Sequence, residues 1–326
     1  MGQSKQLSRR DLLAAASAAG LATGMGAKTA LAADDAAEND SMPYGQIGNV
    51  RISRLLLGGN LISGWMHSRD LKYVNSLFRA YATEEKIIET LGIAEKHGVN
   101  TVFESGATFV ARYNRECGGK MQFIPHIKVD LEQSDAALEK HIQGQVDSGA
   151  VALYVWGVSG DMLIQAGEVG RLAKAVEMAK KHGLPVGVGG HSLQVPVSCE
   201  KHGVPCDFYV KTFHKDDYAS ATPKPLRKDF MWSPGPKERT EGFYDNMWCI
   251  DHEETARFMS TVKKPWLAFK VLAAGAYYPR DGFSFAFDSG ADFIAVGMLD
   301  FQIKANSELM PKVVRRAQDR PRPWMA

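Results

Sequence analysis

EKHGVNTVFE (residues 95–104), KKHGLPVGVGG (180–190) and DSGADFIAVGM (288–298) repeat one local pattern along this chain. In each stretch a polar segment is followed by glycine and then by a short apolar run. Glycine at this place is typical of a helix end, because it adopts the left-handed conformation that closes the last turn. A short apolar run rich in valine and isoleucine is typical of a buried parallel strand. The pattern therefore predicts helices that alternate with buried parallel strands.

The same alternation extends over most of the chain. Eight apolar runs are strand candidates, at residues 55–57, 101–103, 123–129, 151–156, 185–188, 208–210, 267–272 and 293–296. Helical patterns lie between them, among them residues 84–97, 134–146, 162–182 and 252–262. Eight successive strand–helix units are typical of the (β/α)8 TIM barrel. We therefore predict an α/β fold with a single TIM-barrel domain over residues 43–326.

Two long segments interrupt the alternation. Residues 62–82 contain several aromatic side chains and follow the first predicted strand. Residues 215–248 are rich in proline, lysine and aromatic residues and follow the sixth. TIM-barrel active sites are built from the loops after the strands. We expect these inserts to form lids or substrate walls, with irregular surface decoration as the alternative.

The N-terminus carries the pattern of a bacterial export signal. Arg9 and Arg10 precede a weakly hydrophobic run rich in alanine and glycine, which ends in the tripeptide ALA at residues 30–32. These features are typical of twin-arginine signals, with an ordinary surface helix as the alternative. Residues 1–32 are predicted to be the signal peptide, and the acidic residues 33–42 a disordered tether. We expect the twin-arginine export machinery as a partner and a periplasmic or secreted location.

The charge balance narrows the class of partner. The chain has 39 basic and 37 acidic residues, for a net charge of +2. This balance lacks the basic surplus with which proteins attract nucleic acid or anionic membranes. After the predicted signal, no apolar run approaches the ~20 residues of a membrane-spanning helix. We expect a small-molecule substrate, no nucleic-acid partner and no membrane insertion.

The four cysteines, Cys117, Cys199, Cys206 and Cys249, have no close paired spacing of the kind that zinc sites use. Cys199 and Cys206 flank a short Gly/Pro segment and are candidates for a disulfide in an exported protein. Free, buried thiols are the alternative.

The beginning and end of the predicted barrel resemble the aldo/keto reductases. Residues 42–60, MPYGQIGNVRISRLLLGGN, are similar to the opening of that family, in which a hairpin closes the barrel bottom before a first strand ending in Leu-Gly-Gly. Residues 297–306, GMLDFQIKAN, resemble the strand and helix with which the family binds its NADP cofactor. The resemblance implies the same barrel fold.

The catalytic tetrad of that family is not kept. The family uses an Asp after the second strand, a Tyr five residues later as the proton donor, a Lys after the third strand and a His after the fourth. At the matching positions this chain has Glu104, Phe109 and Lys128, and the fourth strand ends in YVWG (154–157) without a histidine. A reductase of that mechanism needs a positioned acid, which phenylalanine cannot supply. We therefore expect a divergent barrel with a replaced site, and NADP is not expected as its cofactor.

Polar and ionisable side chains gather at the predicted C-terminal ends of the strands. The candidates for catalysis are Glu104, His126, Lys128, His191, Lys211 and Lys270, and the candidates for substrate binding are Asn60, Trp156 and His214. Ionisable groups in one barrel mouth are costly to bury without a use. His191 follows the run PVGVGG (185–190), whose glycines allow the backbone to approach a ligand, with a solvated loop histidine as the alternative.

Three of these residues are candidates for a divalent metal site. Glu104, His126 and His191 would supply one carboxylate and two imidazoles, leaving a coordination position for water or substrate. They come from different strands, so no tight sequence spacing supports the site, and the cofactor is otherwise unknown.

Lys211 and Lys270 form the most specific chemical prediction. The stretches CDFYVKTF (206–213) and AFKVLAAGA (268–276) resemble the two lysine strands of deoxyribose-phosphate aldolases. Adjacent ammonium groups lower each other's pKa, which leaves one amine able to attack a carbonyl carbon. Alternatively, either lysine snorkels or pairs with a buried carboxylate. Asp300 stands where a phosphate would bind, so we expect an unphosphorylated substrate.

These features favour an exported barrel enzyme that acts on a small carbonyl or sugar-derived compound by proton transfer or carbon-bond cleavage, as lyases and isomerases do. His191 and Glu104 would act as acid and base, and Lys270 or Lys211 as electrophile or Schiff-base former. Two alternatives stay open: an NADP-dependent reductase of the aldo/keto type, and a periplasmic sugar-binding protein without enzymatic activity. In the latter, the platforms that stack on the sugar would be Trp65, Trp156, Trp232 and Trp248.

Overall fold

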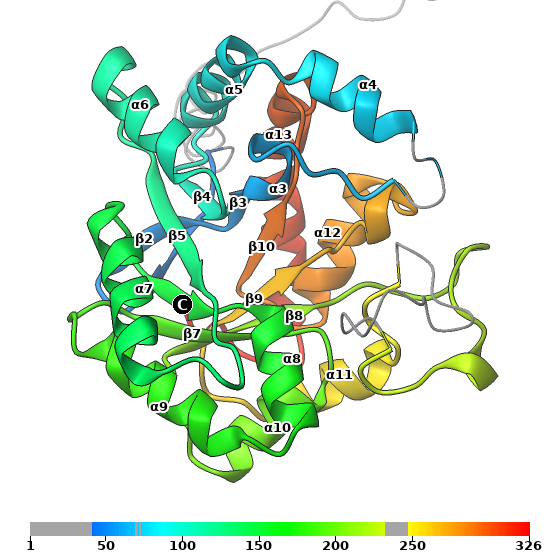
Figure 1. The fold of residues 1–326 in the computed structure, drawn as a ribbon. Coiled ribbons are helices and arrows are strands. Elements are labelled where there is room, and N and C mark those ends of the chain that lie inside the picture. The colour runs from blue at the N-terminus through cyan, green and yellow to red at the C-terminus, as the bar shows by residue number, and fades with distance from the viewer. Residues whose placement is uncertain (1–40, 69–70, 72, 232–246) are drawn as a thin grey trace, which may run out of the picture. The chain divides into compact units, whose positions relative to one another are not determined.

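The computed structural model describes residues 41–68, 71, 73–231 and 247–326, and these belong to one compact unit, Ser41–Ala326. The predicted signal peptide, all but the last two residues of the predicted tether, and Trp232 lie outside the described residues. Within the unit, eight parallel strands form a closed barrel in the order β10-β3-β4-β5-β6-β7-β8-β9 (Figure 1). The predicted TIM barrel is therefore confirmed.

The barrel strands follow the predicted order, with shorter bounds at several ends. They are β3 (Leu55–Gly58), β4 (Thr101–Glu104), β5 (Gln122–Ile127), β6 (Leu153–Val155), β7 (Val186–Gly190), β8 (Phe208–Thr212), β9 (Trp266–Phe269) and β10 (Phe293–Val296). The predictions for the third, fourth and seventh strands ran too far, because apolar residues continue into the loops that follow. Val129, for example, donates its backbone N–H to Ser159 Oγ rather than to a neighbouring strand.

A small hairpin precedes the barrel, as the resemblance to aldo/keto reductases implied. It consists of β1 (Tyr44–Ile47) and β2 (Val50–Ser53), which pair antiparallel with Tyr44 opposite Ser53. Ile47 and Ile52 are fully buried and pack in one cluster with the inward side chains of the barrel strands. The hairpin therefore closes the N-terminal end of the barrel, which leaves the opposite end for a site.

Helices surround the barrel (Figure 1). They are α3 (Gly59–Ile62), α4 (Tyr73–Tyr81), α5 (Glu84–Lys96), α6 (Ala107–Cys117), α7 (Asp135–Asp147), α8 (Gly157–Gln165), α9 (Val169–Lys180), α10 (Gln194–Lys201), α11 (His252–Met259), α12 (Pro279–Asp288) and α13 (Asp300–Arg316), with short 3-10 turns at Lys224–Leu226 (η1), Ala273–Gly275 (η2) and Ala317–Asp319 (η3). Gly98, Gly183 and Gly290 have φ of 82°, 74° and 107°, as the repeated sequence pattern predicted. The helix predicted over residues 162–182 was wrong, because Gly167, with φ 78°, separates α8 from α9.

The core has two layers. One fills the barrel with inward side chains such as Leu56, Phe103 and Tyr154, and the other packs the outward faces of the strands against the helices. Along β8, Phe208 and Val210 belong to the inner layer and Tyr209 to the outer, which is the alternation expected of a strand. This alternation decides which strand residues can reach the barrel mouth.

All four cysteines are free, so of the two alternatives for Cys199 and Cys206 the structure has the free, buried thiols. Both thiols are buried in the outer layer, and burial raises their pKa values. None of the helices in the described part of the chain is long and apolar enough to cross a membrane.

Candidate active site

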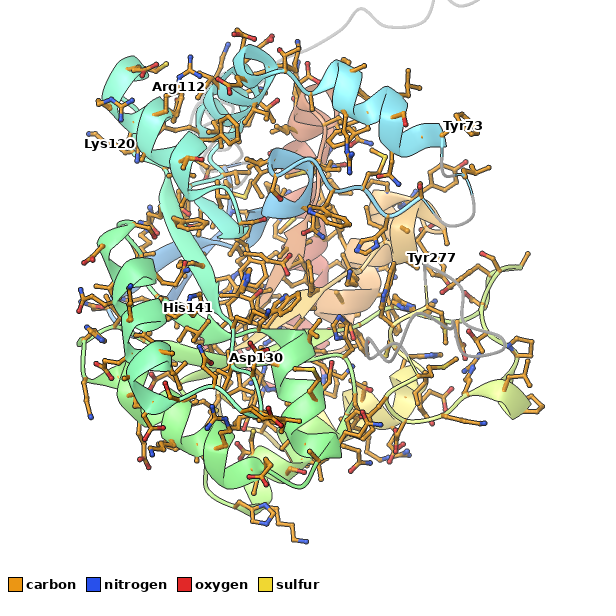
Figure 2. The ribbon with its side chains drawn as sticks, viewed as in Figure 1. Tyr73, Arg112, Lys120, Asp130, His141 and Tyr277 are labelled. Carbon is orange, nitrogen blue, oxygen red and sulfur yellow. The ribbon has the colours of Figure 1, made fainter. Side chains whose placement is uncertain are left out.

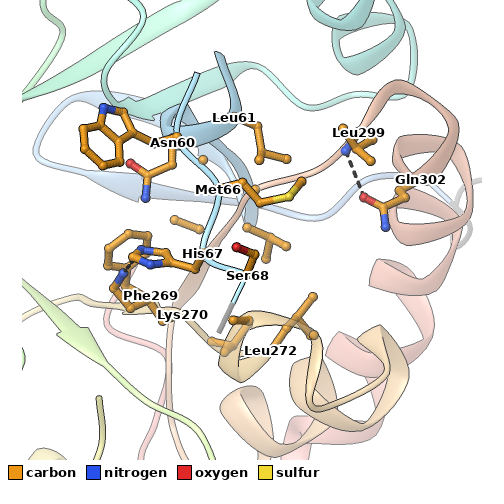
Figure 3. A pocket seen from close by; sticks show the side chains of 18 of the residues that line it. Asn60, Leu61, Met66, His67, Ser68, Phe269, Lys270, Leu272, Leu299 and Gln302 are labelled. Atoms are coloured by element: carbon orange, nitrogen blue, oxygen red, sulfur yellow. Dashed lines mark hydrogen bonds between the residues drawn. The ribbon is translucent and has the colours of Figure 1, made fainter. Parts of the chain in front are cut away.

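A cavity of about 370 Å³ lies at the C-terminal ends of β3, β9 and β10 (Figure 3). Its wall comes from these strand ends, from the start of α13, from the first insert and from Trp248 of the second insert. TIM-barrel active sites lie at this face, and the volume is typical of a small-molecule pocket. Both inserts therefore contribute walls to the cavity, as predicted. Asn60, predicted to bind substrate, lines the cavity from α3.

Lys270 lies in the cavity wall with His67 and Trp248. Its Nζ is 2.6 Å from His67 Nε2 and 4.2 Å from the centre of the Trp248 ring. The Trp248 and His67 rings lie 4.7 Å apart between centroids, at an interplanar angle of 60°. An ammonium group has only donors, so a neutral His67 accepts this hydrogen bond. The Trp248 face adds a favourable interaction with the cation. The contact gives Lys270 a neighbour that can take its proton.

The backbone turns Lys270 into this position. Along β9, Leu267 packs in the barrel interior and Ala268 in the outer layer, so alternation would direct Lys270 outward. Lys270 instead has φ 58°, and Ala273 and Ala274 after it also have positive φ. Such angles are rare for residues other than glycine and occur preferentially at functional sites. The loop after β9 is thus held in an unfavourable conformation that places the lysine in the cavity.

His191 pairs with a carboxylate that was not among the predicted site residues. Its Nδ1 is 2.6 Å from Asp161 Oδ2, and Asp161, on α8, is completely buried. Burial lowers the pKa of His191, and the charges of Lys270, Lys211 and His67 lower it further. The imidazole is therefore neutral, and Asp161 fixes its proton on Nδ1 and its lone pair on Nε2. This arrangement is suited to a general base.

Asp161 is held by the backbone as well as by the imidazole. Its carboxylate accepts hydrogen bonds from the backbone N–H groups of His191 and Ser192, at 3.0 to 3.2 Å. Burial raises the pKa of Asp161, whereas these donors and the charge of Lys211 oppose the rise. We take Asp161 to be the hydrogen-bond acceptor that orients His191. The loop after β7 is therefore fixed to the start of α8.

A second polar cluster surrounds Glu104 at the end of β4. Glu104 Oε1 accepts a hydrogen bond of 3.1 Å from Trp156 Nε1, and the Trp156 ring stacks on His126 at 5.2 Å. His126 Nδ1 lies 3.0 Å from the backbone oxygen of Glu104. Burial raises the pKa of Tyr154 strongly, and the nearby Glu104 charge adds to the rise. These four side chains come together from β4, β5 and the end of β6.

Glu104 also has a strained backbone, with φ 82°. Alternation along β4 would direct it outward, since Phe103 faces the barrel interior. The left-handed conformation turns its carboxylate toward Trp156 instead. Its Oε2 is buried and has no hydrogen-bond partner within the described part of the chain. A buried carboxylate oxygen in this state is rare and indicates a place where a ligand or water binds.

Lys211 does not join Lys270 in the cavity wall. It is 1% exposed, and its ammonium donates to the backbone oxygen of Thr212 at 2.7 Å. Burial lowers its pKa, while Cys249 and Asp161 oppose the change. The predicted cause, a neighbouring ammonium group, was therefore wrong. Strand alternation explains the placement, because Lys211 shares the outward face of β8 with Tyr209.

Two other predicted site residues lie elsewhere. Lys128 is exposed, with its Nζ 3.7 Å from Asp130 and its backbone N–H bonded to His141, and Figure 2 shows Asp130 and His141 near each other. His214 is completely buried, and its Nε2 accepts the backbone N–H groups of Trp248 and Cys249 at 3.0 and 3.1 Å. His214 thus holds Trp248 in the cavity wall and does not itself line the cavity.

The predicted metal site does not form. Among the residues that the structure describes, no three His, Cys, Asp or Glu side chains are grouped in a way that could hold a metal ion. His191 faces Asp161, and His126 lies against the Glu104 backbone. Glu104, His126 and His191 lie at or near the C-terminal ends of their strands, as predicted, but their side chains contact different neighbours.

Sequence reasoning missed Asp161 and the role of His67. Asp161 stands in GVSGDMLIQ (157–165), where it is the only charged residue, and a lone acid in an apolar helix is a signal of a buried, partnered carboxylate. His67 lies in the first insert, and nothing in its local sequence indicates a contact with a residue 203 positions away.

No protein-family model and no curated protein sequence matches the chain. Solved structures match it by fold. A Pseudomonas aeruginosa protein assigned as an aldo-keto reductase is 14% identical, with 84% of this chain and 97% of that one covered and a TM-score of 0.55. A truncated 3-deoxy-D-arabino-heptulosonate 7-phosphate synthase from Thermotoga maritima is 12% identical, with 85% and 91% covered and a TM-score of 0.44. An aldolase is 12% identical, with 72% and 90% covered and a TM-score of 0.41. At these identities the likeness concerns the fold alone.

The structure bears on two features of the aldo/keto reductase resemblance. Phe109 lies on α6 and packs against the outer layer of the core. At the start of α13, the Leu299 N–H donates to Gln302 Oε1 at 2.9 Å, and Asp300 bonds Tyr81 and Lys86. An ionised carboxylate at a helix N-terminus occupies the position that favours anions. This helix start is therefore poorly suited to a phosphate.

Proposed function

We propose that this chain is an enzyme that acts on a small carbonyl compound, with Lys270 as the residue that reacts with the carbonyl carbon. The observation that carries the proposal is the contact between Lys270 Nζ and His67 Nε2 in the wall of the cavity. A lysine reacts as a nucleophile only in its neutral form. His67 is placed to receive the proton that Lys270 must lose.

The chemistry follows from these positions. The Lys270 ammonium passes a proton to His67, and the neutral amine attacks the carbonyl carbon. The carbonyl oxygen leaves as water, with one proton returned from His67 and one from the attacking nitrogen, so a protonated imine remains. Such an imine withdraws electrons from the neighbouring carbon. A base can then remove a proton from that carbon, as an isomerase does. Alternatively, it removes the proton of a hydroxyl group on the next carbon, which becomes a carbonyl group while the bond between the two carbons breaks and its electrons pass to the imine.

His191 is the base in this proposal; like Glu104, it is not among the residues that line the cavity. It is neutral, Asp161 sets its tautomer, and the Lys270 charge is close enough to lower its pKa. Glu104 is the second acid–base candidate, because its buried Oε2 has no partner in the described residues. Isomerases and lyases use proton transfers of this kind. Lys211 has a structural part, because its ammonium is bonded to Thr212.

Reductive trapping tests the proposal. The mature protein is incubated with small aldehydes and ketones and then treated with borohydride, and the adduct is located by peptide mass mapping. We expect one adduct per chain on Lys270, lost in Lys270→Met and kept in Lys128→Met, a control at an exposed lysine. An adduct on Lys211, or one spread over exposed lysines, would contradict the assignment.

A second candidate function is an NADP-dependent reductase. The aldo-keto reductase fold match and the resemblance of residues 297–306 support it, whereas Phe109 and the carboxylate of Asp300 oppose it. Fluorescence titration with NADPH separates the two functions. Saturable binding near 1 µM, equivalent to about 8 kcal/mol, would favour the reductase.

We also propose that the protein is exported, on the basis of the Arg9–Arg10 pair and the ALA tripeptide at residues 30–32. Intact-mass measurement of periplasmic protein is expected to give a chain that begins near Ala33. Replacing both arginines with lysine is expected to leave the precursor in the cytoplasm. Exported protein that retains Met1 would refute cleavage.

A further inference from the structure

We propose that the substrate has an apolar body and a single polar end, which is the carbonyl group placed at Lys270. This inference rests on the proposed function and names its substrate class: aromatic or branched aliphatic aldehydes and ketones rather than sugars. It is based on the chemistry of the cavity wall and on which of its polar groups are already engaged.

Apolar side chains cover most of the wall. Leu61, Met66 and Val74 come from the first insert and the residues before it. Leu272 comes from the loop after β9, and Val296 is the last residue of β10. In Figure 3, Leu61, Met66 and Leu272 lie between the Lys270 side of the cavity and Gln302 on the opposite side. A ligand that extends away from Lys270 therefore meets hydrocarbon.

Two polar side-chain atoms of the wall are engaged with the protein. Gln302 Oε1 accepts from the Leu299 N–H at 2.9 Å, and Ser68 Oγ accepts from Asn75 at 3.2 Å. Asn60 and His67 lie on the same side as Lys270 in Figure 3. A sugar in this cavity would bury several hydroxyl groups with few partners, and each unpartnered polar group lowers affinity strongly.

Trp248 is also poorly placed to stack on a sugar. The Lys270 ammonium stands 4.2 Å from the ring centre, and the His67 ring packs against the same indole at 4.7 Å. The ring therefore contributes to the lysine site. Trp65, the other tryptophan of the cavity wall, is 67% exposed.

The volume sets the size of the ligand. An apolar cavity of roughly 150 Å³ holds one benzene molecule. The present cavity, at about 370 Å³, is more than twice that size. An aromatic ring with a short side chain that ends in a carbonyl group fits this space.

Two matched probes test the inference. Benzylacetone, an aromatic ketone, and fructose, a ketose with a similar number of heavy atoms, are titrated into the mature protein by calorimetry. We expect benzylacetone to bind at least ~10-fold more tightly, because each methylene-sized apolar contact changes the affinity of a pocket by about that factor. Equal or tighter binding of fructose, or no measurable binding of benzylacetone, would overturn the inference.

Variants of the wall assign the affinity to the cavity. Leu272→Asn and Met66→Gln keep the side-chain size and introduce polarity, and both are expected to weaken benzylacetone binding about 10-fold or more. Leu131→Asn, at a leucine that is 45% exposed and does not line the cavity, is the control. Met66 lies in the insert outside the barrel core, so this variant is informative even where Leu272→Asn fails to fold. Unchanged affinity in Met66→Gln would contradict the inference.

A separate reaction distinguishes failure of the inference from failure of the proposed function. Acetaldehyde is too small to contact the distant wall, so its borohydride-trapped adduct on Lys270 reports the lysine chemistry alone. An acetaldehyde adduct together with preferred fructose binding would leave the proposed function standing and refute the apolar substrate. Preferred benzylacetone binding without any acetaldehyde adduct would support the apolar ligand and refute the proposed lysine chemistry.

Discussion

Replacing His214 with phenylalanine removes the acceptor that fixes the segment carrying Trp248. The His214 Nε2 accepts two backbone N–H groups, those of Trp248 and Cys249, and its Nδ1–H donates to the Lys215 oxygen at 2.7 Å. Phenylalanine has a similar shape but cannot accept a hydrogen bond. Each buried N–H left without a partner costs about 1–3 kcal/mol, so we expect a loss of roughly 2–6 kcal/mol in the free energy of unfolding at pH 7.

The same contacts predict a pH dependence for the native protein. Burial lowers the pKa of His214 from 6.5 to about 4, and the charges of Lys211 and His252 add to this effect. The unfolded chain therefore binds a proton on this residue between pH 6.5 and 4, while the folded chain does not. The stabilisation is fully present above pH 6.5 and is lost as pH falls toward 4. A shift of this size corresponds to about 3 kcal/mol.

Urea unfolding at several pH values between 4 and 7.5 measures both effects. Other groups titrate in the same range, so the informative quantity is the difference between native protein and variant. We expect that difference to shrink by about 3 kcal/mol from pH 7 to pH 4. His202→Phe, at an exposed histidine, is the control. A loss below about 1 kcal/mol at pH 7, or an equal pH slope in His214→Phe and native protein, would refute the reasoning.

Three further predictions concern packing, the His191 site and the thiols. Gly160→Ala places a Cβ 2.1 Å from the Gly189 oxygen and should destabilise the protein by about 1–3 kcal/mol in thermal unfolding. Gly144→Ala is the control, because its Cβ has open space around it and the change should be neutral or stabilising. Equal effects of the two variants would contradict the packing of α8 on β7. Asp161→Asn should reduce turnover of the carbonyl substrate by roughly 10²–10⁴-fold, because His191 loses its fixed tautomer. Unchanged kinetics would exclude His191 as the base. When the unfolded protein is alkylated without reductant, its mass should show four modified thiols. Modification of only two thiols would indicate a disulfide.

The architecture could be predicted from sequence because its signals are local. The glycines that end helices, the capping residues Thr83, Ser134 and Asp251, and the buried strand runs each act within a few residues. Parallel strands are buried on both faces, and eight repeated strand–helix units achieve this by closing into a barrel. The inserts were also visible, since they break the repeat.

Strand alternation could have placed Lys211 correctly. Phe208 and Val210 are the inward residues of β8, so a period of two assigns Lys211 to the outer face, where it is buried. The same rule fails for Glu104 and Lys270, because each has a positive φ that reverses the direction of its side chain. No sequence pattern here predicts that a residue other than glycine adopts the left-handed backbone conformation.

The partners of the site residues were decided by tertiary structure. Asp161 meets His191 across 30 positions, Lys270 meets His67 across 203, and His214 binds the Trp248 backbone across 34. Such pairs depend on how helices and inserts pack over the strand ends, and on which nearby group satisfies a buried donor or acceptor. Sequence alone therefore determined the barrel and the end of it that carries polar residues. The packing at that end decided which of those residues face the cavity, because side-chain direction there depends on the backbone angles of single loop residues.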